Sequence, residues 1–225
     1  MHEYRLGERL LAWYLSCITG FIDAVGFIYL GGFFLSFMSG NTTRMTAAAA
    51  EGVWATAGKA AGLMGLFLCG VMLGALIQRT GTRTLPHGRP REVVLGFVVV
   101  ATLTSAAFVA FDNGTAAMLA LSFAVGAMNS TFERNGEVSI SLTYATGTLV
   151  KMAQRFVGSF FGEGHAAWLH NALLWLSLAT GSILGGLCYT LIGLRTVWVV
   201  AALVTAGFAV TMAVRQHRRR RGLPL

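Results

Sequence analysis

Residues 10–30, LLAWYLSCITGFIDAVGFIYL, form an apolar stretch with a single charged side chain, Asp23. At 1.5 Å per residue a helix over this stretch would be about 30 Å long, which matches the hydrocarbon core of a bilayer. The stretch continues well past the length of a signal-peptide core and ends without a small-x-small cleavage pattern. It therefore predicts a membrane-spanning helix that is retained.

Five further apolar segments follow the first. A spanning helix needs about 20 apolar residues, and most of these segments approach that length. The fourth span of the chain is short unless it extends past Asn129. The chain is thus expected to be a single integral membrane domain, all-α, with about six transmembrane helices. The five later segments cover approximately residues 54–77, 93–111, 115–128, 166–191 and 196–214.

The composition excludes an ordinary soluble enzyme. Hydrophobic residues make up 55% of the chain and charged residues 12%, whereas soluble domains contain about 25% charged residues. No Ser-His-Asp, HExxH, GxGxxG or P-loop pattern occurs, so we expect no enzyme activity, no cofactor and no metal site. Cys17, Cys69 and Cys188 lie inside apolar segments and are interpreted as small buried hydrophobes.

The net charge of +8 is concentrated at two places. Residues 79–91 contain four arginines and residues 215–221 contain five. Basic residues beside apolar spans are typical of the cytoplasmic side of a membrane protein. With six spans both clusters and both termini fall on that side, in a bacterial inner membrane. A nucleic-acid partner is not expected, because no soluble face is available to bind one.

Two pairs of similar segments indicate an internal repeat. Residues 35–45 (LSFMSGNTTRM) resemble residues 142–152 (LTYATGTLVKM), 107 positions later. Residues 70–74 (GVMLG) resemble residues 181–185 (GSILG), 111 positions later. The glycine pairs are predicted to be helix-packing faces. Because the two matches occur in the same order, the sequence favours a repeat over chance similarity.

The predicted repeat divides the chain into halves of residues 1–112 and 113–225. Each half would contain three spanning helices. An odd number inverts the second half relative to the first in the membrane. Inverted repeats are common in secondary transporters, whose sites lie near the midplane at the repeat interface and are formed by interrupted helices.

Residues 31–52 and 129–164 are the candidates for such interrupted elements. Both are too polar to span cleanly and too apolar to be ordinary loops. Such backbone is tolerated at membrane depth only where it is buried in protein or lines a cavity. We expect Gly40 and Gly147 to break helices, with half-helices or re-entrant segments after them.

Asp23 is the charged residue of the first span. A charged side chain near the bilayer centre costs about 2.5–3.5 kcal/mol on insertion scales and is usually functional. One alternative is a proton-coupling or solute-binding carboxylate, and the other is a structural carboxylate that caps a neighbouring helix. Arg44 would attract an anionic group or pair with Asp23.

The candidate substrate-binding residues are polar or glycine residues of the two interrupted stretches, together with Asp23. A helix beginning at either stretch would direct free N–H groups and its positive dipole end inward. The candidates are Asp23, Ser39, Gly40, Asn41, Thr42, Thr43, Arg44, Asn129, Ser130, Thr146, Gly147, Thr148 and Lys151.

Residues 20–27 (GFIDAVGF) and 34–44 (FLSFMSGNTTR) together resemble the signature of the YoaK family, bacterial inner-membrane proteins with a domain of unknown function. The resemblance covers nearly the whole chain and implies about six spans, but it implies little about activity. In that family a Gln often precedes the residue equivalent to Asn129, and Met128 stands there in this chain.

Two functions are therefore expected. The first is a secondary transporter or channel for a small polar or anionic solute. The second is a membrane scaffold or assembly partner without transport activity. The lipid bilayer is a partner under both, and a homo-oligomer is compatible with both. A continuous polar cavity at the candidate residues would favour transport, whereas a fully packed interface would favour the scaffold.

Overall fold

The computed structural model describes residues 6–86, 89–134, 137–138, 140, 142–162, 164 and 166–222. Within them the regular secondary structure is helical apart from a short antiparallel hairpin, β1 (Glu133–Arg134) with β2 (Glu137–Val138). Three short 3-10 turns are η1 (Asn129–Phe132), η2 (Ser159–Phe161) and η3 (Gly193–Arg195). The α-helices are α1 (Leu6–Leu30), α2 (Met38–Ala50), α3 (Trp54–Thr84), α4 (Arg89–Ala110), α5 (Gly114–Met128), α6 (Ala145–Gly158), α7 (Ala166–Ile192) and α8 (Thr196–Arg220).

Five helical ranges in the described part of the chain are long and apolar enough to span a membrane. They are α1, α3, α4, the range Gly114–Phe132 that joins α5 to η1, and the range Trp168–Arg220. The last range holds 53 residues and contains α7, η3 and α8. A single helix of that length would reach about 80 Å, far more than a bilayer core of about 30 Å. Gly193, at a φ of 59°, begins the turn that separates its two helices.

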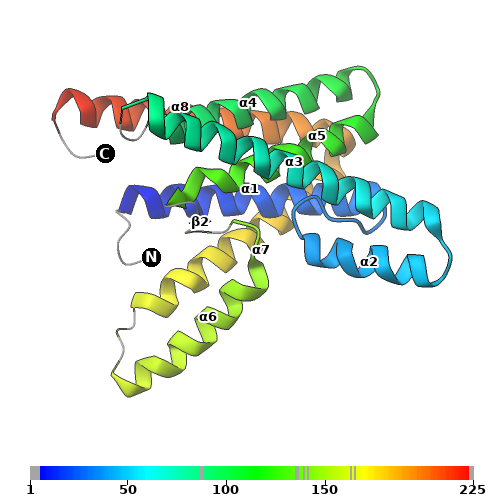
Figure 1. Ribbon diagram of the computed structural model, residues 1–225, viewed down its shortest axis with the longest axis horizontal. Coiled ribbons are helices and arrows are strands. Elements are labelled where there is room, and N and C mark those ends of the chain that lie inside the picture. Colours follow the sequence, from blue (N-terminus) through cyan, green and yellow to red (C-terminus); the bar gives the residue numbers. More distant parts are fainter. Residues whose placement is uncertain are drawn as a thin grey trace.

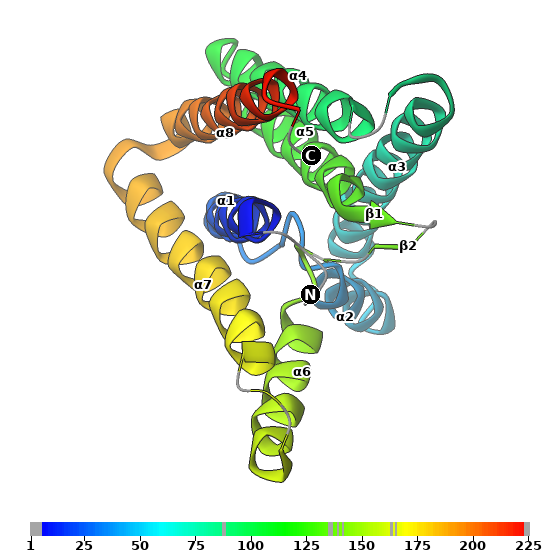
Figure 2. The ribbon, with the colours of Figure 1, turned by 90° about the vertical axis from the view of Figure 1, so that its left-hand side faces the viewer.

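The helices run roughly along one long axis of the molecule. Both described ends of the chain lie at the same end of this axis, and the turn between α4 and α5 lies at the other (Figure 1). Seen along the axis, α1 occupies the middle, with α7, α8 and α5 around it (Figure 2). Helix α6 and the beginning of α7 project away from the remaining helices (Figure 1).

The helix pairs connect distant parts of the sequence. Helix α1 packs most extensively against α7, and α5 packs against α3 and α4. Helix α4 also packs against α8. The short helices pack against the long helices that follow them, α2 against α3 and α6 against α7. Most of the largest buried side chains come from α1, α5 and the segments that follow them, and these include Ile18, Ile22, Leu35, Met118, Leu121, Met128, Phe132 and Leu142.

Glycines form the two closest helix contacts. Between α1 and α7, a Cβ at Gly20, Gly181 or Gly185 would overlap a backbone carbonyl group of the facing helix. Between α3 and α5 the same holds for Gly70, Gly74 and Gly126. The prediction that the glycine pairs of residues 70–74 and 181–185 are packing faces is confirmed. Small residues let helix backbones approach closely in lipid, where no hydrophobic force drives helices together.

The two basic clusters meet at the end of the molecule where the described chain begins and ends. Arg91 Nη1 donates to Glu8 Oε1 at 2.8 Å. Glu92 Oε1 accepts from Arg215 Nη1 at 3.3 Å and from Arg219 Nη2 at 2.6 Å. The ion pairs with Glu92 therefore join the start of α4 to the end of α8, and the predicted placement of both clusters at one end agrees with the structure.

Candidate functional site

The first interrupted segment covers residues 31–37. Helix α1 ends at Leu30, and Gly31 and Gly32 follow at φ angles of 72° and 90°, which L-residues with side chains rarely adopt. Helix α2 begins at Met38. The chain thus leaves one helix, returns beside it and enters a second helix of 13 residues.

Asp23 holds this segment in place. Its Oδ1 accepts from the backbone N–H of Leu35 at 2.8 Å and from that of Ser36 at 2.7 Å. Its Oδ2 accepts from the hydroxyl of Ser36. Hydrogen bonds of this kind to a carboxylate satisfy both the charge and the backbone groups that the break in the helix leaves free. The geometry therefore corresponds to the structural role that the sequence left open for Asp23.

Asn41 holds the same segment from the other side. It lies in the first turns of α2 with 0% of its surface exposed. Its Oδ1 accepts from the N–H of Phe34 at 3.0 Å, and its Nδ2 donates to the carbonyl of Phe34 at 2.7 Å. One amide side chain thus replaces both backbone partners that a helix would have given Phe34.

Arg44 and Lys59 bind the carbonyl end of α1. Arg44 Nη1 donates to the carbonyl of Gly32 at 2.6 Å, and Lys59 Nζ donates to that of Leu30 at 2.8 Å. Both cations also lie over the ring of Phe33, at 4.3 and 4.6 Å. Cations at a helix C-terminus stabilise its free carbonyls and its dipole.

The suggested ion pair between Asp23 and Arg44 is absent from the described residues. Arg44 donates instead to the carbonyl of Gly32, and Asp23 accepts from loop N–H groups. Lys59 was missed at the sequence level. The available signal was its position as a lone lysine inside the apolar stretch 54–77, where a charge needs a partner.

The second interrupted segment follows η1. Asn129 Nδ2 donates to the carbonyl of Val125 at 3.1 Å, and its Oδ1 accepts from the Thr143 hydroxyl at 3.4 Å. Ser130 donates to the carbonyl of Val71 in α3 at 3.4 Å. Asn129 and Ser130 are both buried. These contacts fix the end of α5 beside α3 and the segment that leads into α6.

A short helix follows each interrupted segment, but the glycines do not break the helices. Gly40 is the third residue of α2, and Gly147 is the third residue of α6, which has 14 residues. Each break lies before the glycine, where residues leave the helical conformation. A Cβ at Gly40 would collide with the rings of Phe34 and Phe37, and one at Gly147 with the ring of Tyr144. The glycines therefore make room for aromatic rings over the first helical turn.

The remaining candidates fall into a buried and an exposed group. Thr148 is 9% exposed and its hydroxyl donates to the carbonyl of Tyr144 at 2.9 Å. Thr42 and Thr43 are exposed on α2, where their hydroxyls donate to carbonyl groups one turn back. The exposed group is Ser39, Thr42, Thr43, Thr146 and Lys151.

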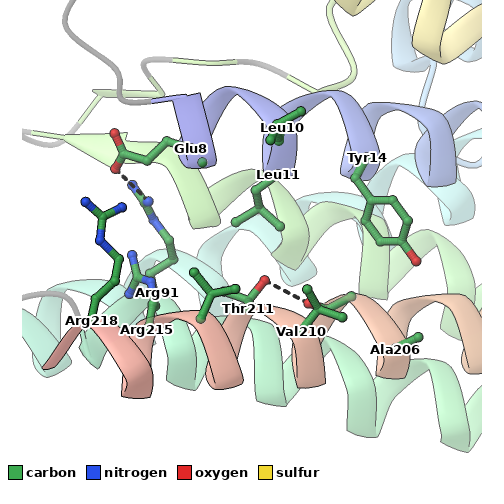
Figure 3. A pocket seen from close by; sticks show the side chains of 13 residues that line it. Glu8, Leu10, Leu11, Tyr14, Arg91, Ala206, Val210, Thr211, Arg215 and Arg218 are labelled. Carbon is green, nitrogen blue, oxygen red and sulfur yellow. Dashed lines mark hydrogen bonds and ion pairs between the residues drawn. The ribbon is translucent and has the colours of Figure 1, made fainter. Parts of the chain in front are cut away.

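A cavity of about 470 Å³ lies away from all of these candidates, between α1 and α8. Its lining includes Leu10, Tyr14 and Val210, with arginines at one end (Figure 3). Among the residues that the structure describes, no cluster of three or more His, Cys, Asp or Glu side chains is arranged to bind a metal ion.

A family model described as "Protein of unknown function (DUF1275)" matches residues 11–210. The UPF0700 transmembrane protein RA0705 of Rhizobium meliloti (strain 1021) is 28% identical over 207 residues, 91% of this chain and 87% of that protein. The UPF0700 transmembrane protein YoaK of Bacillus subtilis (strain 168) is 25% identical over 164 residues, 71% of this chain and 73% of that protein. No solved structure matches the chain significantly.

Proposed function

The chain belongs to the DUF1275 family of transmembrane proteins, as its resemblance to the YoaK family predicted, and we propose that it is a secondary transporter or channel for a small polar or anionic solute. The observation behind the proposal is the presence of two short helices, each preceded by a non-helical segment and each bearing exposed polar residues. Broken helices with polar first turns form the solute sites of many transporters.

The proposal includes an inverted repeat of helices α1–α4 and α5–α8. Its support is that the contacts between α1 and α7 resemble the contacts between α5 and α3. Ser16 of α1 donates to the carbonyl of Leu174 in α7 at 3.1 Å. The hydroxyl of Ser122 in α5, 106 positions after Ser16, lies 3.0 Å from the carbonyl oxygen of Leu35 and 3.3 Å from that of Leu63 in α3. Leu63 and Leu174 are 111 positions apart, the same offset as the matching glycine segments.

The close glycine contacts follow the same offsets. Gly20 and Gly126 are 106 positions apart, and Gly70 and Gly181 are 111 positions apart. The first helix of each half would then pack against the long helix that follows the short one in the other half, α1 against α7 and α5 against α3. A two-fold axis in the membrane plane would produce this arrangement. Six spans result in this arrangement: α1, α3, α4, α5 with η1, α7 and α8.

The two interrupted segments would be equivalent as well. Ser36 donates its hydroxyl to Asp23, and Thr143 donates its hydroxyl to Asn129. The offsets are 106 for the acceptors and 107 for the donors. The two interrupted segments would then be held in the same way, by the Asp23 carboxylate in one half and by the neutral Asn129 amide in the other.

The exposed hydroxyl groups are the proposed solute contacts. Thr42 and Thr43 lie on α2, and Thr146 lies in the first turn of α6 with Lys151 one turn later. Each short helix packs mainly against one long helix, so its other faces stay open. Polar groups at membrane depth normally face a water-filled path or the protein interior rather than lipid. A path between these faces would admit a small hydrated solute.

The second candidate is a membrane scaffold without transport. The observation in its favour is that Asp23, Asn41 and Arg44 are all satisfied by groups of the same chain. Buried polar pairs of this kind can fix a fold without binding anything. Under this alternative the exposed face of α2 would contact a partner protein.

An uptake assay separates the two candidates. The full chain is reconstituted in liposomes and screened with labelled sugars, amino acids and small anions, with and without a pH gradient. For a transported solute, Thr43→Val should lower the uptake rate about 3- to 10-fold through the loss of one hydrogen bond. Thr104→Val is the matched control, because Thr104 is an exposed hydroxyl on α4 with the same bond to its own helix. Absence of uptake for every solute class, with folded protein present, would favour the scaffold.

The proposed orientation places both termini in the cytoplasm of a bacterial cell, with the protein in the inner membrane. It rests on the arginines at the ends of α3, α4 and α8, because basic residues are enriched beside spans on the cytoplasmic side.

A further inference from the structure

The cavity between α1 and α8 is an apolar groove with a basic mouth. Leu10, Leu11, Val210 and Val214 form its walls, and the basic mouth is the end that Arg91, Arg215 and Arg218 line (Figure 3). Several of these side chains are strongly exposed, Val210 at 63% and Leu10 at 52%. The groove is therefore open along its length, as a site for a chain-like apolar ligand must be.

The deep end of the groove is closed by Tyr14. Its hydroxyl donates to the carbonyl of Leu203 at 2.8 Å, and its ring lies where a side chain at position 207 would otherwise stand. From Gly207 to Arg218 the groove follows twelve residues of α8, a length of about 16 Å. This is about half of a 30 Å hydrocarbon core, the depth of one leaflet.

The mouth has an excess of positive charge. Arg91, Arg215 and Arg218 line it together with one carboxylate, Glu8. Arg91 is paired with Glu8, and Arg215 with Glu92 beside the groove. The Nε of Arg218 is buried and has no hydrogen-bond partner among the described residues. The groove therefore offers a guanidinium donor for which the described part of the chain supplies no acceptor.

We propose that this groove binds an anionic phospholipid, with one acyl chain between α1 and α8 and the phosphate group at Arg218. Basic pockets between transmembrane helices are suited to anionic head groups, and phosphate oxygens are strong acceptors for a guanidinium fork. The walls exclude a free polar solute, and the charge at the mouth favours an anionic head group over a zwitterionic one. The site is separate from the proposed transport path and does not depend on it.

Native mass spectrometry of the full chain tests the proposal. The protein is titrated in detergent with phosphatidylglycerol and, in parallel, with phosphatidylcholine of the same acyl chains. One tightly bound phosphatidylglycerol is expected, with clearly weaker phosphatidylcholine. Arg218→Gln should weaken phosphatidylglycerol binding about fivefold, the effect of one basic residue at a membrane surface. The matched control is Arg220→Gln, because Arg220 is exposed on the same helix end outside the groove.

A second variant tests the apolar part. Val210→Trp should fill the groove and weaken both lipids without unfolding the protein, because Val210 is mostly exposed. Equal losses for the Arg218 and Arg220 variants would show general attraction to a basic surface and overturn the proposal. Equal binding of the two lipids, or no effect of Val210→Trp, would do the same.

Discussion

Asp23 gives the most direct test of how the interrupted segment is held. Asp23→Ala removes three hydrogen bonds. The backbone N–H groups of Leu35 and Ser36 lose their acceptor, and so does the hydroxyl of Ser36. An unsatisfied buried donor costs about 1–3 kcal/mol, so we expect a loss of about 3–5 kcal/mol in the free energy of unfolding. Asp23→Asn keeps a carbonyl oxygen for the two N–H groups and should cost only about 1 kcal/mol.

Thermal unfolding in detergent, followed by tryptophan fluorescence, measures the difference. For a chain of this size 1 kcal/mol corresponds to about 2–4 °C in the melting temperature, so Asp23→Ala should lower it by about 10 °C and Asp23→Asn by a few degrees. Ser36→Ala, which removes one of the three donors, should fall between wild type and Asp23→Ala. Glu51→Ala is the control, because Glu51 is an exposed carboxylate at the end of α2.

Equal melting temperatures for Asp23→Ala and wild type would refute the anchoring role. A large loss for Asp23→Asn, as large as for Asp23→Ala, would show that the charge itself is needed and that the hydrogen-bond count is the wrong explanation. Loss of solute uptake in Asp23→Asn at an unchanged melting temperature would show that Asp23 takes part in transport.

Three further predictions concern packing, charge and topology. Gly181→Val should separate α1 from α7 and cost at least about 3 kcal/mol, because its Cβ would overlap a backbone carbonyl; Gly186→Val is the control in the same melting assay, because a Cβ there would meet only the end of the Ile28 side chain, at 3.8 Å. Glu92→Gln should leave two arginines without their carboxylate and cost about 3 kcal/mol, seen as a lower melting temperature. Reporter fusions at Asn113 and at the C-terminus should lie on opposite sides of the membrane; the same side for both would exclude the six-span topology.

The helices themselves were predictable because their signal is local. Apolar runs such as residues 10–30 meet the length requirement of a bilayer without reference to the rest of the chain. The short helices after each polar segment were also predicted. The end of the segment 115–128 was ambiguous in the sequence, and the structure continues it as η1 through Phe132.

The contacts at the interrupted segments were harder to predict, because they depend on where the chain turns. Asp23 binds residues twelve and thirteen positions later, and Arg44 reaches back to Gly32 instead of to Asp23. Opposite charges at a suitable spacing suggested an ion pair, but Arg44 donates to a free carbonyl in the loop just after α1. Gly40 was interpreted as a helix breaker, whereas its role depends on the rings of two phenylalanines.

The groove between α1 and α8 had no local signal at all. Tyr14 and Gly207 are far apart in the sequence, and each alone is an ordinary residue of an apolar span. Their contact appears only once α8 has returned beside α1. The arginines at the mouth were recognised as a topology signal, but their spatial relation to the apolar walls could not be derived from composition.

The close contact of α1 with α7 has a consequence for how the protein is made. Helix α1 leaves the ribosome before the other described helices, but α7, which packs against its glycine face, begins at Ala166. At a synthesis rate of about 5–20 residues per second, α1 has to remain in the membrane for roughly 8–30 s before that partner is available. Helix α5, in contrast, finds α3 already synthesised. Until α7 is synthesised, the glycine face of α1 lacks the helix that covers it, and a chain truncated after α4 would leave that face uncovered.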